Sequence, residues 1–200
     1  MKLSVLLATT FAALAPIHAY AAPPTTIQFQ MVASSNTCLP HAWATVTDHS
    51  FGEFENLEVV VYGLPPKTDF DLFSIEVPAK PFGMAWYIGD IVTDDTGTGV
   101  GNFVGRFNIE TFVVSPGVPT TPPPNVFHSP PAVVPEATAG ITTNPIQLYH
   151  LGLWFNSPAD AQKACGVATV TPFNGEHNAG TQVLNTHNFL DNKGPLINLQ

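Results

Sequence analysis

Short segments in which apolar and polar residues alternate recur along the first half of the chain. In Ile27–Met31 every second residue is apolar, and Ala42–Val46 repeats the pattern more weakly. Alternation with a period of two is typical of a strand with one buried face. Leu57–Tyr62 is a denser apolar run rich in valine, a residue favoured in strands. We therefore predict strands throughout this half.

Turn residues separate further segments of the same kind. The next predicted strands are Phe70–Val77, Met84–Thr93, Gly101–Phe107 and Ile109–Val114. Prolines in Gly63–Thr68 end the preceding strand because proline fixes φ and has no N–H to donate. Asp94–Gly99 has the Asp and Gly residues of a tight hairpin turn. Short, evenly spaced strands predict an all-β fold, an immunoglobulin-like antiparallel β-sandwich.

The second half begins with a segment crowded with prolines, residues 115–145. Proline excludes a helix or a central strand there, so the segment is either a linker or a long surface loop. Ile146–Phe155 is then a predicted apolar strand. Ser157–Ala164 predicts the one short helix, with Ser157 as N-cap, Pro158 in the first turn and Gly166 to end it.

The N-terminus has the three parts of a secretory signal. Lys2 is the positive residue, Leu3–Leu14 is an apolar run, and Ala19 and Ala21 flank the position where we predict cleavage, before Ala22. An uncleaved anchor is the alternative, but the run is shorter than the roughly 20 apolar residues that span a bilayer. We expect residues 1–21 to be removed. The mature protein is then extracellular, periplasmic or envelope-associated, with no transmembrane segment.

We expect residues 22–200 to form one domain that includes the proline-rich loop 115–145. The segment after the prolines is about 55 residues long, and chains of that size seldom fold alone without help. The alternative is a sandwich over 22–114, a linker over 115–145 and a C-terminal subdomain over 146–200.

Two cysteines, Cys38 and Cys165, are present. In an exported chain an isolated pair favours a disulfide bond. Two buried thiols or a metal site are the alternatives.

Charge excludes two classes of partner. The formal net charge is −9 at pH 7, and the basic residues after the signal are scattered: Lys67, Lys80, Arg106, Lys163 and Lys193. Nucleic-acid binding needs a concentrated basic surface, as does binding to anionic lipid. We therefore expect neither, and no motif predicts a cofactor.

The stretch Val59–Phe103 resembles a pattern in uncharacterised exported bacterial β-sandwich proteins. It contains a strand, the turn G-L-P-P-K-T, a second strand and then I-G-D-I-V-T-D-D-T-G-T-G-V-G-N-F. More loosely, it is similar to fibronectin type III and other immunoglobulin-like modules. The resemblance covers about a quarter of the chain. It implies the fold and export, and it carries over no functional residue.

The segment Asn174–Thr181 has the highest density of functional side chains. Glu176, His177 and Asn178 supply an acid, an imidazole and an amide between two glycines. We take these three as the candidate ligand-binding residues. The alternative is a turn whose side chains satisfy the backbone of the loop.

The sequence does not favour a metal site or a sugar-binding site. His177 and His187 are weak metal candidates, because no H-x-H or H-E-x-x-H pair is present. Asp90, Asp94 and Asp95 do not match a calcium loop, so a hairpin turn is favoured. The sequence contains three tryptophans, for which core positions are favoured over a sugar-stacking face: Trp43, Trp86 and Trp154.

These observations predict a secreted binding protein or a structural, envelope-associated protein of unknown extracellular ligand. Catalytic residues are not assigned, because no nucleophile motif such as G-x-S-x-G is present. The alternative function is a secreted hydrolase or metal-dependent enzyme with a site near Glu176, His177 and His187.

Overall fold

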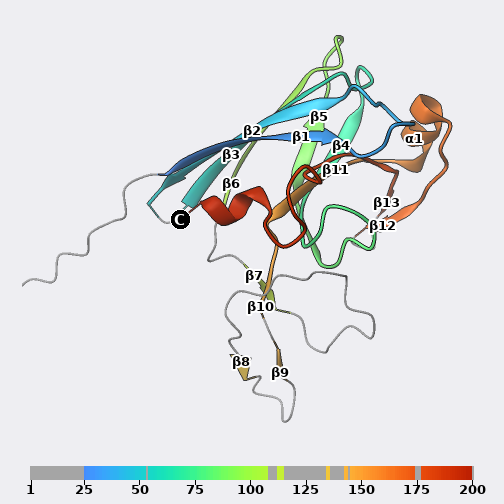
Figure 1. The fold of residues 1–200 in the computed structure, drawn as a ribbon. Helices are drawn as coiled ribbons and strands as arrows, with labels where there is room; N and C mark the ends of the chain where they lie inside the picture. The colour runs from blue at the N-terminus through green and yellow to red at the C-terminus, as the bar shows by residue number, and fades with distance from the viewer. Residues whose placement is uncertain are drawn as a thin grey trace, which may run out of the picture.

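The computed structural model describes residues 25–52, 54–107, 112–114, 134–135, 142–143, 145–173 and 177–199. It confirms a mostly antiparallel β protein with one short α-helix (Figure 1). Residues 1–21, the predicted signal, lie outside the described residues, as does Glu176.

Eight strands form one sheet in the order β5-β4-β11-β14-β1-β2-β3-β6. Each neighbouring pair is antiparallel. The bounds are β1 (Thr26–Ala33), β2 (Trp43–Phe51), β3 (Phe54–Tyr62), β4 (Asp69–Ile75), β5 (Ala85–Val92), β6 (Gly99–Gly105), β11 (His150–Phe155) and β14 (Gln182–Asn185). Two strands from the C-terminal part, β11 and β14, therefore lie between β4 and β1.

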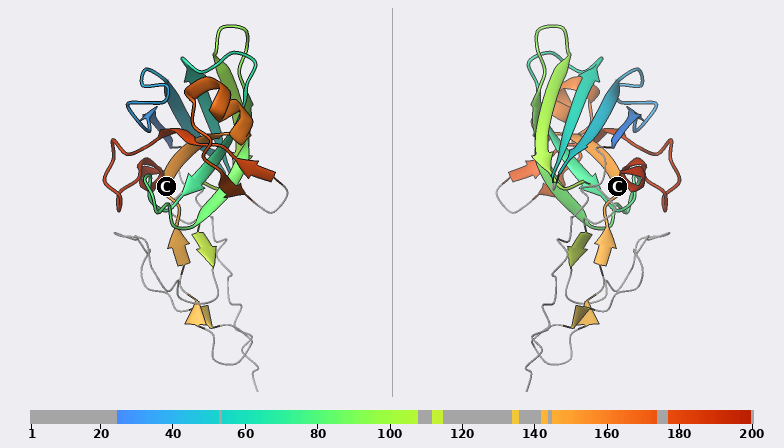
Figure 2. Two further views of the ribbon diagram at one scale, coloured as in Figure 1. Left: turned by 90° about the vertical axis from the view of Figure 1, so that its right-hand side faces the viewer. Right: turned by 90° about the vertical axis from the view of Figure 1, so that its left-hand side faces the viewer.

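The sheet curls until it is nearly closed, so that its strands surround a common interior (Figure 2). The edge strands β5 and β6 are joined by a tight turn, with one bridge between Thr93 and Gly99. Phe103 of β6 packs against Gly89 of β5, where an added Cβ would lie 2.5 Å from the ring. The Phe103 side chain thus packs between β5 and β6, which are not paired there by a regular hydrogen-bonded ladder.

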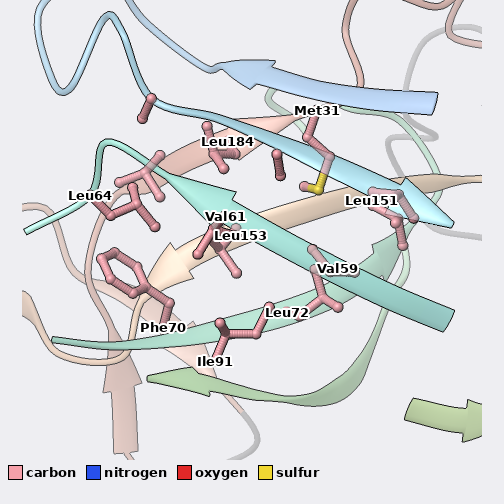
Figure 3. Close-up of a cluster of buried hydrophobic side chains, with 14 of the residues drawn as sticks. Met31, Val59, Val61, Leu64, Phe70, Leu72, Ile91, Leu151, Leu153 and Leu184 are labelled. Carbon is pink, nitrogen blue, oxygen red and sulfur yellow. The ribbon is translucent and has the colours of Figure 1, made fainter. Parts of the chain in front are cut away.

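The main core fills this interior (Figure 3). Every second residue of β2 and β3 is buried, as the alternation in the sequence predicts. Inward side chains from six strands meet there: Met31, Val59, Val61, Phe70, Leu72, Ile91, Leu151, Leu153 and Leu184.

The turn between β5 and β6 is built around one carboxylate. Asp94 Oδ1 accepts hydrogen bonds from the backbone N–H groups of Thr96 and Thr98, at 2.8 and 3.1 Å. Gly97 has φ +79°, and a Cβ there would lie 2.0 Å from the carbonyl oxygen of Leu64. The hairpin turn predicted at this position is confirmed, and it needs glycine for both reasons.

The helix α1 (Pro158–Cys165) has the predicted ends. Ser157 Oγ accepts from the N–H of Asp160 at 3.1 Å, and Gly166 adopts φ 69° at the C-terminus. The helix lies at one end of the sheet, where Ala161 joins the core (Figure 1). The predicted disulfide is confirmed, because Cys165 bonds to Cys38 in the connection from β1 to β2.

Three short ladders lie outside the main sheet (Figure 1). They pair β7 (Phe112–Val114) with β10 (Pro145–Gln147), β8 (Val134–Pro135) with β9 (Thr142–Thr143), and β12 (Thr171–Phe173) with β13 (His177–Ala179). Most of the proline-rich segment 115–145 lies outside the described residues. Residues 167–170 form no strand and lead into β12.

The chain ends in a 3-10 helix, η1 (Pro195–Asn198), which the sequence analysis did not predict. In the part of the chain that the structure describes, no helix is long and apolar enough to cross a membrane.

Candidate functional site

A second, smaller core lies on the outer face of the sheet. Phe73 and Ile75 of β4, Trp154 of β11 and Ala179 of β13 form it, with Phe82 packed against them. The rings of Phe73 and Phe82 each meet Trp154 edge-on, with centroids 5.3 and 5.0 Å away. The β12–β13 hairpin therefore covers part of the outer face of β4 and β11.

This second core leaves a pocket of about 170 Å³ between the sheet and the hairpin. We call it the apolar pocket, and its main walls are Phe73, Phe82, Ala85, Trp154, Pro172 and Ala179. An apolar cavity of about 150 Å³ in another protein accommodates benzene. The apolar pocket is therefore large enough for one ring-sized group.

A carboxyl and an imidazole lie next to the apolar pocket along the same strands. Asp71 is two residues from Phe73 on β4, and His177 is two residues from Ala179 on β13. Residues two apart on a strand share a face. His177 Nε2 lies 3.8 Å from Asp71 Oδ2. The pair therefore joins the β12–β13 hairpin to the sheet next to the apolar pocket.

Asp71 is fully buried, whereas 43% of the His177 side chain is exposed. No N–H or hydroxyl group of the described residues donates to the Asp71 carboxylate, whose side chain interacts with the Asp90 carboxyl. Burial raises the pKa of Asp71 to about 7; the His177 imidazole lowers it, and the nearby Asp90 and Asp69 raise it further. Asp71 therefore exchanges its proton near neutral pH, which is common at functional sites.

Two further acids surround Asp71. Asp90 of β5 lies directly opposite it in the ladder, and Asp69 is two residues away on β4. The Tyr87 hydroxyl donates to Asp90 Oδ1 at 2.6 Å, and Asn156 Nδ2 donates to Asp69 Oδ2 at 3.1 Å. Burial, followed by the hydrogen bond to Asp90, raises the pKa of Tyr87. The outer face of β4 and β5 is therefore acidic next to the apolar pocket, and donors hold two of the three carboxylates, those of Asp90 and Asp69.

A second pocket of about 220 Å³ shares the walls Phe82 and Thr171 with the apolar pocket. We call it the polar pocket, because Ser34, Gln182 and Asn185 line it, together with Lys80. The Asn185 amide donates to the carbonyl oxygen of Pro78 at 2.9 Å, which fixes part of this wall. The two pockets are thus neighbours on either side of Phe82.

The structure places the three predicted ligand-binding residues differently. His177 lies over Asp71, whereas Asn178 is exposed and, as its neighbour on β13, points to the other side of the strand. Glu176 lies outside the described residues. Sequence analysis did not select Asp71, and it assigned Asp90 to a hairpin turn. The available signal at Asp71 was a carboxylate between two apolar residues, Phe70 and Leu72, of a predicted strand.

The two histidines considered for a metal site are not brought together. His177 precedes β14 and His187 follows it, where the His187 ring pairs with the Asn185 side chain. No group of three His, Cys, Asp or Glu residues that could hold a metal ion occurs within the described ranges.

Another histidine, His150, is a core residue. Its Nε2 donates to the carbonyl oxygen of Asp191 at 3.1 Å, so its Nδ1 accepts from the Thr186 hydroxyl at 2.8 Å in the neutral ring. Burial lowers the pKa of His150.

The tryptophans do not form one binding face. Trp154 is buried in the second core, as expected. Trp43 of β2 stacks on Tyr62 with centroids 4.4 Å apart and is 40% exposed, while Trp86 of β5 is 64% exposed. The core position expected for these two is therefore wrong, because both side chains are exposed.

No family model matches this chain, and no curated protein or solved structure matches it significantly. The resemblance of Val59–Phe103 to exported bacterial β-sandwich proteins therefore stays a prediction.

Proposed function

We propose that this is an exported binding protein that holds a ring-sized apolar group of a small ligand in the apolar pocket. The observation that supports this most is the pocket itself, about 170 Å³ in volume and placed beside the buried Asp71 carboxyl. Apolar walls with a few polar groups at one end are the usual design of a small-molecule site.

Export is the second part of this proposal. The Cys38–Cys165 disulfide supports it, because such bonds persist in oxidising compartments. The signal at residues 1–21 stays a prediction. So does the immunoglobulin-like sandwich, for which the support is the antiparallel all-β content of the chain.

A neutral ring compound tests the binding function. We expect 2-phenylethanol to shift the NMR amide signals of Gly83 and Ala179, which line the apolar pocket. Ala179→Leu fills the pocket and should weaken binding roughly tenfold or more. Ala85→Leu fills it from an exposed position on β5, in case the first variant unfolds. Val92→Leu, exposed on the same strand, is the control. Binding that both pocket variants leave unchanged would contradict the proposal.

A hydrolase is the second candidate, favoured by one observation. Asp71, whose pKa is raised to about 7, lies beside His177 and Asp90, an arrangement suited to general acid–base catalysis. Nitrophenyl esters and glycosides test it. Turnover by the wild type that Asp71→Asn abolishes would favour the enzyme, and equal rates for both proteins would favour binding.

A further inference from the structure

Acidic residues lie next to the apolar pocket, although none of them is among the described residues that line it. Asp69, Asp71 and Asp90 gather on β4 and β5 beside it. None of the described residues that line the apolar pocket is a lysine or an arginine. A negative group on a ligand would meet repulsion beside these acids, whereas a positive group would find carboxylates.

Asp71 provides a second, independent observation. Its side chain is fully buried, and no N–H or hydroxyl group in the described part of the chain donates to its carboxylate. With the His177 imidazole 3.8 Å away, beyond hydrogen-bond distance, the buried carboxylate has not regained the donors that it lost with water, which is unfavourable. An ammonium group supplies three donors and the opposite charge, so it satisfies both needs.

The spacing between pocket and acid limits the shape of the ligand. Asp71 is two residues from Phe73, a wall of the apolar pocket, along the same face of β4. Two residues along a strand span about 6.6 Å. An amine joined to a ring by about two carbon atoms covers most of that distance.

We propose that the ligand carries a cationic amine joined by a short link to its apolar ring, and that Asp71 and Asp90 receive the amine. This rests on the proposed function, because it adds a headgroup to the ring that the apolar pocket holds. The shared chemistry occurs in a free arylalkylamine and in the N-terminal residue of a peptide.

His177 competes with the amine for Asp71. Its imidazole lies 3.8 Å from the Asp71 carboxylate and is partly exposed. A ligand ammonium must share the carboxylate with this ring or displace it. Removing the ring in His177→Ala therefore exposes Asp71, and we expect it to strengthen amine binding.

The affinity should rise with pH, because the amine binds the ionised carboxylate. The pKa of Asp71 is about 7, and the groups that face it are His177 on β13, Asp90 and Tyr87 on β5, and Asp69 on its own strand. The neighbouring strand β11 presents Trp154, which does not titrate. Raising the pH from 6 to 8 ionises Asp71 and should strengthen binding by roughly tenfold.

The experiment compares five probes by calorimetry on the intact disulfide-bonded protein. These are 2-phenylethylamine, 2-phenylethanol, 3-phenylpropionate and the peptide Phe-Gly-Gly with free or acetylated N-terminus. We expect the amine to bind roughly tenfold or more tighter than the alcohol, and the carboxylate not to bind. Asp71→Asn should remove the preference for the amine. Asp95→Asn, the same change on the exposed turn, should leave it intact.

Each outcome decides one question. Equal binding of amine and alcohol, unchanged in Asp71→Asn, would overturn the amine while leaving the ring-binding function in place. Absence of binding by every probe would overturn both. If Asp71→Asn does not fold, a weaker rather than stronger amine affinity in His177→Ala would overturn the inference. Binding of Phe-Gly-Gly but not 2-phenylethylamine would identify the source as a peptide.

Discussion

Acidic residues are buried on both faces of the sheet. Asp71 lies on the outer face, and Asp48 points into the core, where it is 0% exposed and close to Glu55. Burial, followed by repulsion from Glu55, raises the pKa of Asp48 to about 7. For Asp48, an interaction with the His49 backbone acts in the opposite direction and lowers the pKa. Its protonation therefore affects folding directly.

We predict that Asp48 makes the protein less stable as the pH rises. A carboxyl with a raised pKa binds its proton more tightly in the folded state. Its contribution to the free energy of unfolding is full below its usual pKa of 3.8 and is lost as the pH rises through about 7. The free energy of unfolding of Asp48→Asn, measured relative to that of the wild type, should therefore rise by on the order of 2 kcal/mol as the pH increases from 5 to 8. Urea unfolding at four pH values measures this difference.

The comparison with the variant removes opposing contributions. The lowered pKa of buried His150 acts in the opposite direction, since stability from that group is lost as the pH falls below about 6.5. Both proteins contain His150, so its effect cancels. Asp95→Asn on the exposed turn is the control. A difference between Asp48→Asn and wild type that stays constant with pH would refute the prediction.

The sequence alone predicts the burial of Asp48 but not the contact between Asp71 and His177. The alternation in β2 places Asp48 on the same face as Ala44 and Val46, so an inward acid follows from the period of two. The contact between Asp71 and His177 does not follow, because it joins strands far apart in the chain. It depends on the β12–β13 hairpin lying over β4.

Among the elements, α1 depends on a covalent link. It has eight residues, fewer than an isolated helix needs, and one buried residue, Ala161. The disulfide joins its last residue, Cys165, to Cys38 across a sequence separation of 127. The bond therefore attaches the helix and the start of the β12–β13 hairpin to the connection between β1 and β2.

We predict that the Cys38→Ser/Cys165→Ser double variant loses on the order of 4–5 kcal/mol of stability, from the chain entropy released in the unfolded state. Urea unfolding measures it, and the reduced wild type should lose a similar amount. Ser157→Ala, which removes only the N-cap hydrogen bond, is the comparison and should lose about 1 kcal/mol. If the double variant loses no more stability than Ser157→Ala, the disulfide contributes little.

Prediction of the elements succeeded where local chemistry decides the structure. The ends of α1 follow from Ser157 and Gly166, and the β5–β6 turn follows from Asp94 and Gly97. The β12–β13 hairpin was missed because its strands are only three residues long and contain a proline, Pro172, and an asparagine. Packing on the outer face of the sheet, rather than strand propensity, holds it.

At the scale of the whole molecule, the strand order was beyond the sequence pattern. Alternation and turns show that strands exist, but they do not show that β14 pairs with both β11 and β1. Nor do they show that β11 lies beside β4, with a long proline-rich segment between them in sequence. Which strands become neighbours depends on the burial of one shared core, to which strands from both ends of the chain contribute.

We predict that a chain ending at Gly180 does not fold. It lacks β14, which pairs with both β1 and β11 and contributes the buried residues Val183 and Leu184. Circular dichroism should show no cooperative melting. Deleting 120–131, a shorter segment that includes none of the eight strands, should lower the melting temperature only slightly. Cooperative melting of the first variant, or collapse of the second, would contradict this.

The position of β14 in the sheet also determines how late in synthesis the sheet can be completed. Ribosomes make β14 last of the eight strands, yet it lies near the middle of the sheet, between β1 and β11. The sheet is incomplete until residue 185 has been made, so the edge of β1 that faces β14 stays unpaired through most of translation, while its other edge can pair with β2. Under the export proposed above, a sheet that cannot be completed early would leave the chain free to cross a membrane channel unfolded.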